Sequence, residues 1–318
     1  LPAKAARINR STSKCVGCSY LGDRPMTDAR ELTEALGGKW YRCYGAAPCP
    51  VCQSERRKGQ NALTLADGLN GLLAHCKRSA CTFGDILAAA GIAPGTLTPP
   101  DPAKLAQREA ERRAEAEQRT RQALAVWQEA RPIGGTVAET YLRGRGITCP
   151  LPPALRFHPE TWHGPTAKRF PALVALVEGG DGFAVHRTYQ RADGSGKADL
   201  DPPKAMLGAV SGGAIRLTGG PGPLVVAEGI ETALSLASGL LQRPATVWAA
   251  LSTSGIRGLH LPSQPGRLTI APDGDDPGRA AAHALAERAH GLGWQVAFLD
   301  PGDGRDWNDI LTGKAVAA

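Results

Sequence analysis

Acidic residues follow the apolar runs of the last third of the chain, and this placement restricts the fold. Three runs have the length and composition of buried strands: residues 224–227, 268–271 and 296–299. Four acids lie at or shortly beyond the ends of these runs: Glu228, Asp273, Asp275 and Asp306. The carboxyl ends of parallel strands open into one crevice, so these acids can meet there. Carboxylates without matching cations repel one another, and Mg²⁺ or Mn²⁺ would relieve the repulsion. The pattern predicts a divalent-metal site suited to phosphoryl transfer.

Strand-like and helix-forming segments alternate from residue 223 onward. Besides the three runs above, we predict a strand at 246–251 and helices at 230–241 and 278–290. This order is typical of βαβ units, so residues 223–318 are expected to form an α/β domain with a mostly parallel sheet.

The segment before this domain differs in character. Between residues 132 and 222, Pro and Gly punctuate short β-like runs, and FPALVALVE and GFAVHRTYQ flank the turn signal GGD. This indicates a hairpin in a small mixed α+β subdomain. Residues 94–131 are expected to form a linker followed by a charged helix that is solvated in its first turns and docked only at its end.

Seven of the eight cysteines lie in residues 1–93, which we expect to form a zinc-binding domain. Two pairs separated by strand-like runs have the pattern of a tetrahedral thiolate site for a structural Zn²⁺: Cys49, Cys52, Cys76 and Cys81. His75 is the second choice in place of Cys76. Three further cysteines are expected to be reduced thiols, with an incomplete second site as the alternative: Cys15, Cys18 and Cys43.

Charge is unevenly distributed along the 318 residues, a length that suits two or three domains. The formal net charge is +7, but residues 223–318 carry seven Lys and Arg against ten Asp and Glu, which leaves +10 for residues 1–222. Such an excess suits a polyanionic partner, with an ordinary basic surface as the alternative. Basic residues flanking the cysteine pairs could meet phosphates: Arg56, Arg57, Lys58, Lys77 and Arg78. No apolar run reaches about 18 residues and no secretory signal is evident, so a cytoplasmic protein without a membrane span is expected.

Several motifs together resemble the primases of bacteria, their phages and plasmids. The cysteine pattern is followed by E-G-x-x-T-A-L and D-G-D, the motif set of the Toprim domain shared with topoisomerases and some nucleases. Other segments resemble zinc-binding primase-like proteins of mobile elements: GGKWYRCYGAAPCPVC, ETYLRGRGI, RFHP, HRTYQ and PPKAMLG. The resemblance implies a zinc ribbon at residues 1–93, a primase subdomain at 132–222 and a catalytic Toprim domain at 223–318.

The resemblance also implies roles for individual residues. Glu228 matches the Toprim glutamate, Asp273 and Asp275 match the paired metal-binding aspartates, and Asp306 matches a later aspartate. Asp276 and Asp309 are weaker candidates for metal binding. The alternative for Asp276 is an N-cap ahead of Pro277, and the alternative for Asp309 is a helix N-terminal residue. Candidates for holding nucleotide or DNA are His186, Arg187, Lys204, Gly229 and Arg305. The first three are chosen because they lie in the β-like segments just before the Toprim strands, with merely solvated side chains as the alternative. Gly229 and Gly274 would let backbone approach a phosphate or form a tight turn.

The implied activity is synthesis of short RNA primers on a single-stranded DNA template from nucleoside triphosphates, in replication of a mobile element. No G-x-x-x-x-G-K-[ST] motif is present, so a separate replicative helicase is an expected partner. A nuclease would need only the same metal and water. A topoisomerase would need a nucleophilic tyrosine, for which no supporting domain is visible. A non-enzymatic DNA-binding protein is the third alternative.

Overall fold

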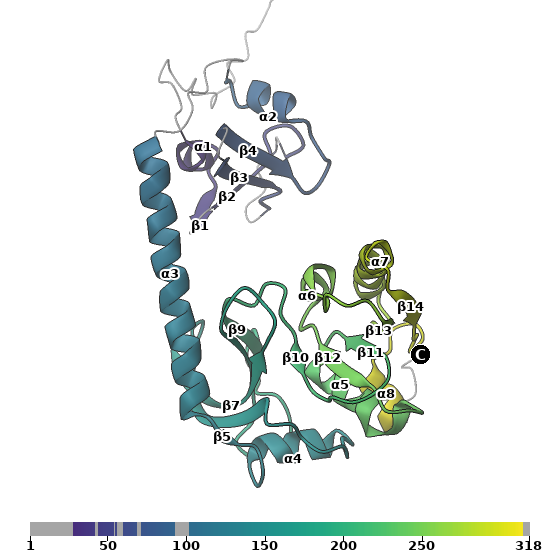
Figure 1. The fold of residues 1–318 in the computed structure, drawn as a ribbon. Coiled ribbons are helices and arrows are strands. Elements are labelled where there is room, and N and C mark those ends of the chain that lie inside the picture. Colours follow the sequence, from purple (N-terminus) through teal and green to yellow (C-terminus); the bar gives the residue numbers. More distant parts are fainter. Residues whose placement is uncertain are drawn as a thin grey trace, which may run out of the picture. The chain divides into compact units, whose positions relative to one another are not determined.

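The computed structural model describes residues 28–41, 44–53, 55, 60–68, 71–92 and 102–313. The chain divides into two compact units, residues 1–112 and 113–318. Among the described residues the strands form three sheets, one in the first unit and two in the second (Figure 1). No helix in this part of the chain is long and apolar enough to cross a membrane.

The first unit is a small antiparallel sheet with two short helices. Its strands are hydrogen-bonded in the order in which they occur in the sequence: β1 (Lys39–Tyr41), β2 (Tyr44–Ala47), β3 (Leu63–Gly68) and β4 (Gly71–Cys76). Helix α1 (Ala29–Ala35) is capped by the Asp28 carboxylate and α2 (Phe83–Ala89) by the Thr82 hydroxyl. Leu32, Leu63 and Ile86 meet in the core of this unit.

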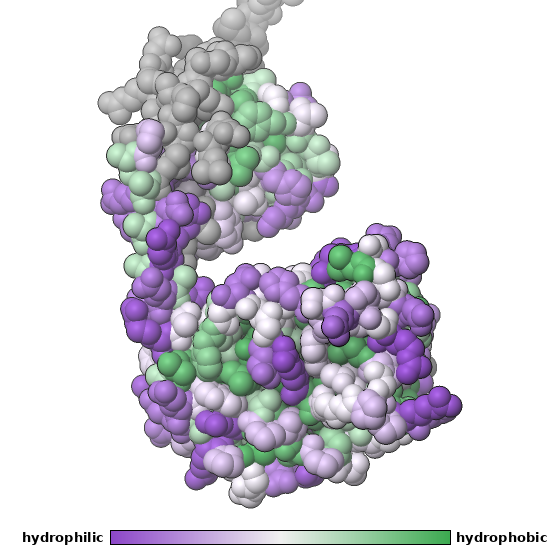
Figure 2. Space-filling model, viewed as in Figure 1, coloured by the Kyte–Doolittle hydropathy of each residue, from purple (hydrophilic) through white to green (hydrophobic). Residues whose placement is uncertain are grey.

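Helix α3 (Pro102–Glu129) carries mostly exposed, hydrophilic side chains along its first part (Figure 2). Within the first unit, Arg108 forms ion pairs with Asp28, at 2.9 Å, and with Asp67. Near its end, Ala123 and Trp127 pack against the second sheet. The helix is therefore docked at its end, as expected, while the contacts of Arg108 were not predicted.

The second sheet is an antiparallel meander that contains the expected hairpin. Its strands are β5 (Arg131–Pro132), β6 (Leu155–His163), β7 (Lys168–Val177), β8 (Ala184–Tyr189) and β9 (Lys204–Gly208), with α4 (Val137–Gly144) between β5 and β6. Val174 and Val185 face α3. The opposite face, which includes Leu155 and Leu173, shares one hydrophobic core with α4 and the third sheet.

The third sheet has the order β10-β12-β11-β13-β14, and all its pairs are parallel except β10 with β12. Its strands are β10 (Ile215–Arg216), β11 (Leu224–Ala227), β12 (Thr246–Ala249), β13 (Arg267–Ala271) and β14 (Gln295–Phe298). The predicted mostly parallel sheet and the mixed α/β fold are thus confirmed.

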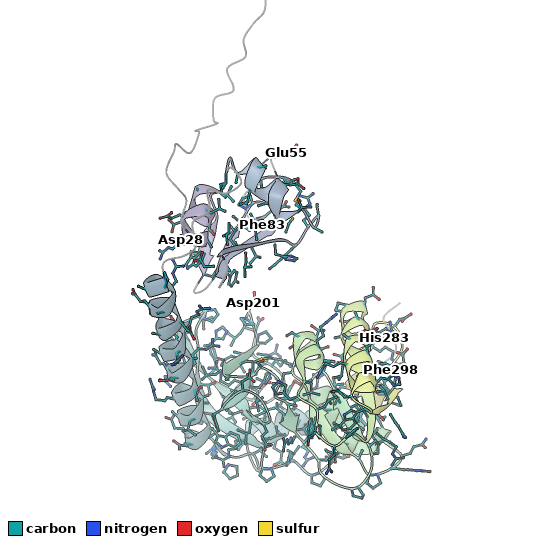
Figure 3. The ribbon with its side chains drawn as sticks, turned by 45° about the horizontal axis from the view of Figure 1, so that its top comes forward. Asp28, Glu55, Phe83, Asp201, His283 and Phe298 are labelled. Carbon is teal, nitrogen blue, oxygen red and sulfur yellow. The ribbon has the colours of Figure 1, made fainter. Side chains whose placement is uncertain are left out.

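Helices cover both faces of the third sheet (Figure 1). Helix α5 (Ile230–Ser235), the following turn η1 (Leu236–Leu240) and α8 (Trp307–Thr312) pack on the side of the second sheet. Helices α6 (Thr253–Gly258) and α7 (Asp276–Gly291) cover the other side. His283 of α7 and Phe298 of β14 lie side by side with ring centroids 5.1 Å apart (Figure 3).

One predicted helix is shorter than expected. Regular α-helix was predicted for residues 230–241 but ends at Ser235, and the chain continues in a wider π-type turn. Gly239 has a φ of +122°, which side chains other than glycine rarely tolerate, and this conformation ends the helical segment.

Candidate active site and metal centres

Four cysteine side chains converge in the first unit. The Sγ atoms of Cys49, Cys52, Cys76 and Cys81 all lie within 4.8 Å of one another, and the Cys52 and Cys76 sulfurs are 3.5 Å apart. A tetrahedral zinc–thiolate site places its sulfurs roughly 3.8 Å apart, from Zn–S bonds of about 2.3 Å. The cluster predicted from the cysteine spacing is therefore present and can hold one metal ion.

The ionisation of these thiols also favours a bound cation. Burial works against ionisation of Cys76, but the backbone N–H groups of Ser79, Arg78 and Cys81 outweigh it and lower the pKa to about 6. Burial and the neighbouring cysteines raise the pKa of the Cys81 thiol to about 12. One thiolate therefore forms readily, and its negative charge hinders ionisation of the other thiols. A cation bound by all four sulfurs would remove this repulsion and stabilise the cluster.

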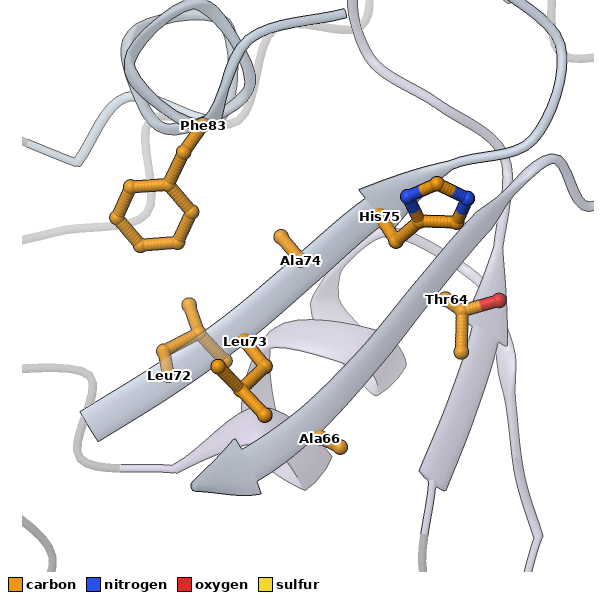
Figure 4. Close-up of a pocket in the computed structure, with 7 residues that line it drawn as sticks. All are labelled: Thr64, Ala66, Leu72, Leu73, Ala74, His75 and Phe83. Carbon is orange, nitrogen blue, oxygen red and sulfur yellow. The ribbon is translucent and has the colours of Figure 1, made fainter. Parts of the chain in front are cut away.

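His75 is exposed and does not belong to the cysteine cluster. It lies opposite Thr64 in the sheet and lines a recess of about 470 Å³ with Thr64, Ala66, Leu72, Leu73, Ala74 and Phe83 (Figure 4). Lys77 and Arg78 are exposed in the turn that follows β4. The remaining residues named for this domain lie outside the described residues: Cys15, Cys18, Cys43, Arg56, Arg57 and Lys58.

The third sheet brings the predicted carboxylates together. Glu228 directly follows β11 and Asp273 follows β13, and these two strands are parallel neighbours with Ala227 opposite Ala271. Burial and the charges of Asp273 and Asp275 raise the pKa of Glu228 to about 7. Burial and the charges of Asp306 and Asp275 raise the pKa of Asp273 to about 6, although Thr232 donates a hydrogen bond to it. The four acids therefore share one electrostatic site.

Two of these acids also cap helices. Asp275 Oδ1 accepts a hydrogen bond from Gly278 N at 2.7 Å, and Asp306 Oδ1 accepts one from Asp309 N at 2.8 Å. Each carboxylate can still direct its second oxygen toward a cation. The N-cap of α7 is Asp275, so the alternative that placed the cap at Asp276 is wrong by one residue. Asp309 is a helix N-terminal residue, as its alternative proposed, and it completes a capping box with Asp306.

Gly274 fastens the two loops that carry the aspartates. Its N–H donates to the carbonyl of Arg305 and its carbonyl accepts from Gly304 N, both at 2.8 Å. A Cβ at position 274 would collide with the Gly302 carbonyl oxygen. A glycine is needed at position 274 because the two loops pack closely. Position 229 does not impose this requirement, since a Cβ there would come no nearer than 3.4 Å to another atom, at Thr232 Oγ1.

The carboxylates are more open than the cysteine cluster. Within the described ranges, only the four cysteines place three or more possible ligand atoms within 4.8 Å of one another. Mg²⁺ usually keeps several of its waters and takes only one or two protein carboxylates directly. A loose group of mutually repelling acids therefore fits a hydrated divalent cation better than a closed protein cage.

The basic residues named as candidates do not all reach this site. The charge of Lys204 partly offsets the rise in the pKa of both Glu228 and Asp273, which places this charge near the carboxylates. His186 is buried and lies on the same face of the second sheet as Lys204. Lys204 is paired with Thr188 on the neighbouring strand, and His186, two residues before Thr188, points to the same side because side chains alternate along a strand. Arg187 points to the opposite face, where it donates to the Trp162 carbonyl at 2.9 Å.

Arg305 and Gly229 lie beside the carboxylates in the sequence and also in space. The Arg305 carbonyl accepts from Gly274 N, and its Nε is buried without a hydrogen-bond partner among the described residues. Gly229 is the N-cap residue of α5 and directly follows Glu228.

The sequence reasoning missed Glu231, which is 4% exposed in α5. Its carboxylate is 3.3 Å from Lys197 Nζ and 3.2 Å from Lys204 Nζ, and it accepts a hydrogen bond of 2.7 Å from the Tyr141 hydroxyl. Burial alone would raise its pKa, but Lys204, Lys197 and Tyr141 hold the pKa well below its usual range. The signal in the sequence was a single acid within the apolar helical segment IETALSLA.

Two parts of the chain match family models. Residues 223–316 match the Toprim domain, and residues 117–217 match a domain of unknown function (DUF7146). No curated protein matches the chain. A solved structure similar to it is the crystal structure of the Aquifex aeolicus primase (zinc-binding and RNA polymerase domains), with 14% identity and a TM-score of 0.39 over 91% of this chain and 82% of that chain. The Toprim assignment made from the E-G-x-x-T-A-L and D-G-D motifs is confirmed, and the C-terminal part of this chain is a Toprim domain.

Proposed function

We propose that this protein is a DNA primase that synthesises short RNA primers on single-stranded DNA by metal-dependent nucleotidyl transfer. The observation that carries the proposal is the convergence of Glu228, Asp273, Asp275 and Asp306 at one edge of a Toprim sheet, where burial and mutual repulsion raise the pKa of two of them. These acids would hold Mg²⁺ or Mn²⁺. A divalent cation there would polarise the α-phosphate and neutralise the pyrophosphate leaving group.

The residues of the chain would mainly supply position and charge. In the proposed reaction, the 3′ oxygen of one nucleotide bonds to the α-phosphorus of the next, the bond to pyrophosphate breaks, and the hydroxyl proton passes to water. Lys204, whose charge acts on Glu228 and Asp273, would contact the phosphates of an incoming nucleotide. Most of the rate enhancement would come from aligning the reactants and from electrostatic stabilisation.

In this proposal the four-cysteine cluster holds a structural Zn²⁺, and its unit contacts the template. The recess beside β4 presents Leu73, 59% exposed, and Phe83, 42% exposed, and exposed Lys77 and Arg78 follow the same strand. An apolar and aromatic surface next to positive charge suits single-stranded DNA, because bases stack on the rings and phosphates meet the cations. Replication of a mobile element, a cytoplasmic location and cooperation with a separate replicative helicase belong to the same proposal.

The test is incubation of the protein with single-stranded DNA, labelled ribonucleotides and Mg²⁺ or Mn²⁺. We expect short RNA products that disappear with Asp273→Ala and persist with Glu287→Ala, a matched change of an exposed acid on α7 of the same domain. Shortened template in place of RNA would show a nuclease instead. Binding of DNA with neither product would show a non-catalytic DNA-binding protein.

A further inference from the structure

Glu231 occupies an interior position that is costly for a carboxylate. Its side chain is 6% exposed, and an unpaired charge removed from water to this extent is strongly unfavourable. The partners that compensate it come from three separate segments: α4, the loop before β9, and β9 itself. An acid held at this cost, between the second and third sheets, requires an explanation beyond helix formation.

The charges around Glu231 do not balance. Two ammonium groups, of Lys197 and Lys204, share the single carboxylate, and Tyr141 contributes a neutral hydroxyl. His186 is buried on the same face of the second sheet as Lys204, and burial together with the Lys204 charge lowers its pKa to about 3. Its Nδ1 has no hydrogen-bond partner within the described part of the chain. With two ammonium groups for one carboxylate, the ion pairs of Glu231 leave a net positive charge in this group.

Lys204 is the member of this group that turns toward the metal-binding acids. Its side chain is 36% exposed, and its charge acts on both Glu228 and Asp273. Lysine has a long, flexible side chain, so its ammonium group needs a fixed partner to remain at one place. Glu231 is that partner: its buried carboxylate lies 3.2 Å from the ammonium group of Lys204, whose side chain remains partly exposed to solvent.

We infer that Glu231 is a positioning residue, which holds the ammonium group of Lys204 beside the metal-binding carboxylates so that it receives the phosphates of a nucleoside triphosphate. Glu231 itself contacts neither the metal nor the nucleotide. This inference rests on the proposed nucleotidyl transfer, and it assigns the buried ion pair a purpose in that reaction.

Glu231→Gln tests the inference because it keeps the shape of the side chain and removes its charge. The two lysines would then repel each other, and Lys204 would leave its position. We expect magnesium tripolyphosphate, measured by calorimetry, to bind about tenfold more weakly, and the KM for nucleotides to rise by a similar factor with a smaller change in kcat. Ile256→Val, a core change on the other side of the sheet, should destabilise the protein without changing either constant.

A double-mutant cycle separates positioning from a merely structural role. Once Lys204→Ala has removed the positioned group, adding Glu231→Gln should weaken tripolyphosphate binding no further. Fully additive losses, or unchanged binding in Glu231→Gln, would overturn the inference. If Glu231→Gln does not fold, Tyr141→Phe takes its place, since it removes the hydrogen bond that orients the carboxylate. It should weaken binding to a smaller extent, and unchanged binding would again overturn the inference.

The same measurements distinguish failure of the inference from failure of the proposed function. A wild-type protein whose binding of magnesium tripolyphosphate depends on Glu231 and Lys204, but which makes no primers, would contradict primer synthesis and support the phosphate site. A wild-type protein that makes primers with the same KM when Glu231 is replaced would keep primer synthesis and overturn the positioning role.

Discussion

The indole N–H of Trp307 donates a hydrogen bond of 3.1 Å to the carbonyl oxygen of Pro272. This contact joins the first residue of α8 to the loop that carries Asp273. Asp306, directly before Trp307, is thereby held near Asp273, whose pKa it raises together with burial. The buried indole thus adds to the backbone hydrogen bonds of Gly274 in setting the spacing of two acids far apart in the sequence.

Replacing Trp307 with Phe should loosen the carboxylate site. The ring remains but the donor is lost, which leaves the buried Pro272 carbonyl without this partner and costs roughly 1 kcal/mol of stability. Because Asp306 and Asp273 are then less firmly held, we expect weaker Mn²⁺ binding in a titration. Trp294→Phe, in the core on the other side of the sheet, should leave Mn²⁺ binding unchanged. Equal Mn²⁺ affinity in the Trp307 variant would show that this contact does not shape the site.

Gly274→Ala should damage the same site by a different route. The added methyl group collides with the Gly302 carbonyl, so one of the two packed loops must move, at a cost of roughly 1–3 kcal/mol. Gly229→Ala is the matched change, because its Cβ meets no atom closer than 3.4 Å. Thermal unfolding should therefore show a clear loss of stability for Gly274→Ala and little loss for Gly229→Ala. Similar losses in both variants would contradict this account of the loops.

The four-cysteine cluster predicts one tightly bound zinc ion per chain. Structural zinc sites contribute about 10–16 kcal/mol of binding free energy, which serves folding directly. We expect Cys76→Ser to lose the zinc and the cooperative unfolding of the first unit, while the core of residues 113–313 is retained. Metal analysis of the purified protein is the measurement. Two equivalents of zinc would show that Cys15, Cys18 or Cys43 also bind metal.

Phe83→Ala should weaken binding of single-stranded DNA if the recess beside β4 stacks bases. A base stacked on an aromatic ring contributes about 1–3 kcal/mol, so we expect affinity to fall about tenfold in a fluorescence titration. Leu292→Ala provides the comparison, since it removes an exposed apolar side chain, 57% exposed, from the other unit. An unchanged affinity in the Phe83 variant would place the template elsewhere.

Much of the site could be predicted because it depends on the order of strands and helices along the chain and on the spacing of neighbouring residues. Parallel neighbouring strands end at the same edge, so the meeting of Glu228 and Asp273 follows from the order of strands and helices. The cysteine spacing likewise implies a hairpin that brings both pairs together, and β3 and β4 form it. In both cases the deciding information lies within a few residues of each functional side chain.

The features that were missed depend on contacts across long stretches of sequence. The burial of Glu231 requires Tyr141, 90 residues earlier, and no local pattern reveals that contact. Arg187 was grouped with His186, although neighbours on a strand point to opposite faces and only the packing of α3 decides which face is which. The N-cap of α7 was misplaced by one residue because Asp275 and Asp276 offer the same chemistry next to Pro277.

The buried His186 predicts a specific pH dependence of stability. Burial and the Lys204 charge lower its pKa to about 3, whereas in the unfolded chain it is near 6.5. Below about pH 6.5 His186 therefore binds a proton in the unfolded state but stays neutral in the folded state, so the stability of the protein falls as the pH falls. Glu228 and Asp273 act in the opposite sense, because their raised pKa values let the folded state bind protons first.

The prediction therefore concerns the difference between the wild-type protein and His186→Gln, in which the contributions of the acids cancel. Between pH 7 and pH 5.5 the wild-type protein should lose roughly 1 kcal/mol of stability relative to this variant. Denaturant unfolding at several pH values measures the difference. His283→Gln, a change of an exposed histidine on α7, should follow the wild-type curve. Parallel curves for the wild-type protein and His186→Gln would mean that His186 has the same pKa in the folded and unfolded states, which would contradict the effect of burial and of the Lys204 charge on it.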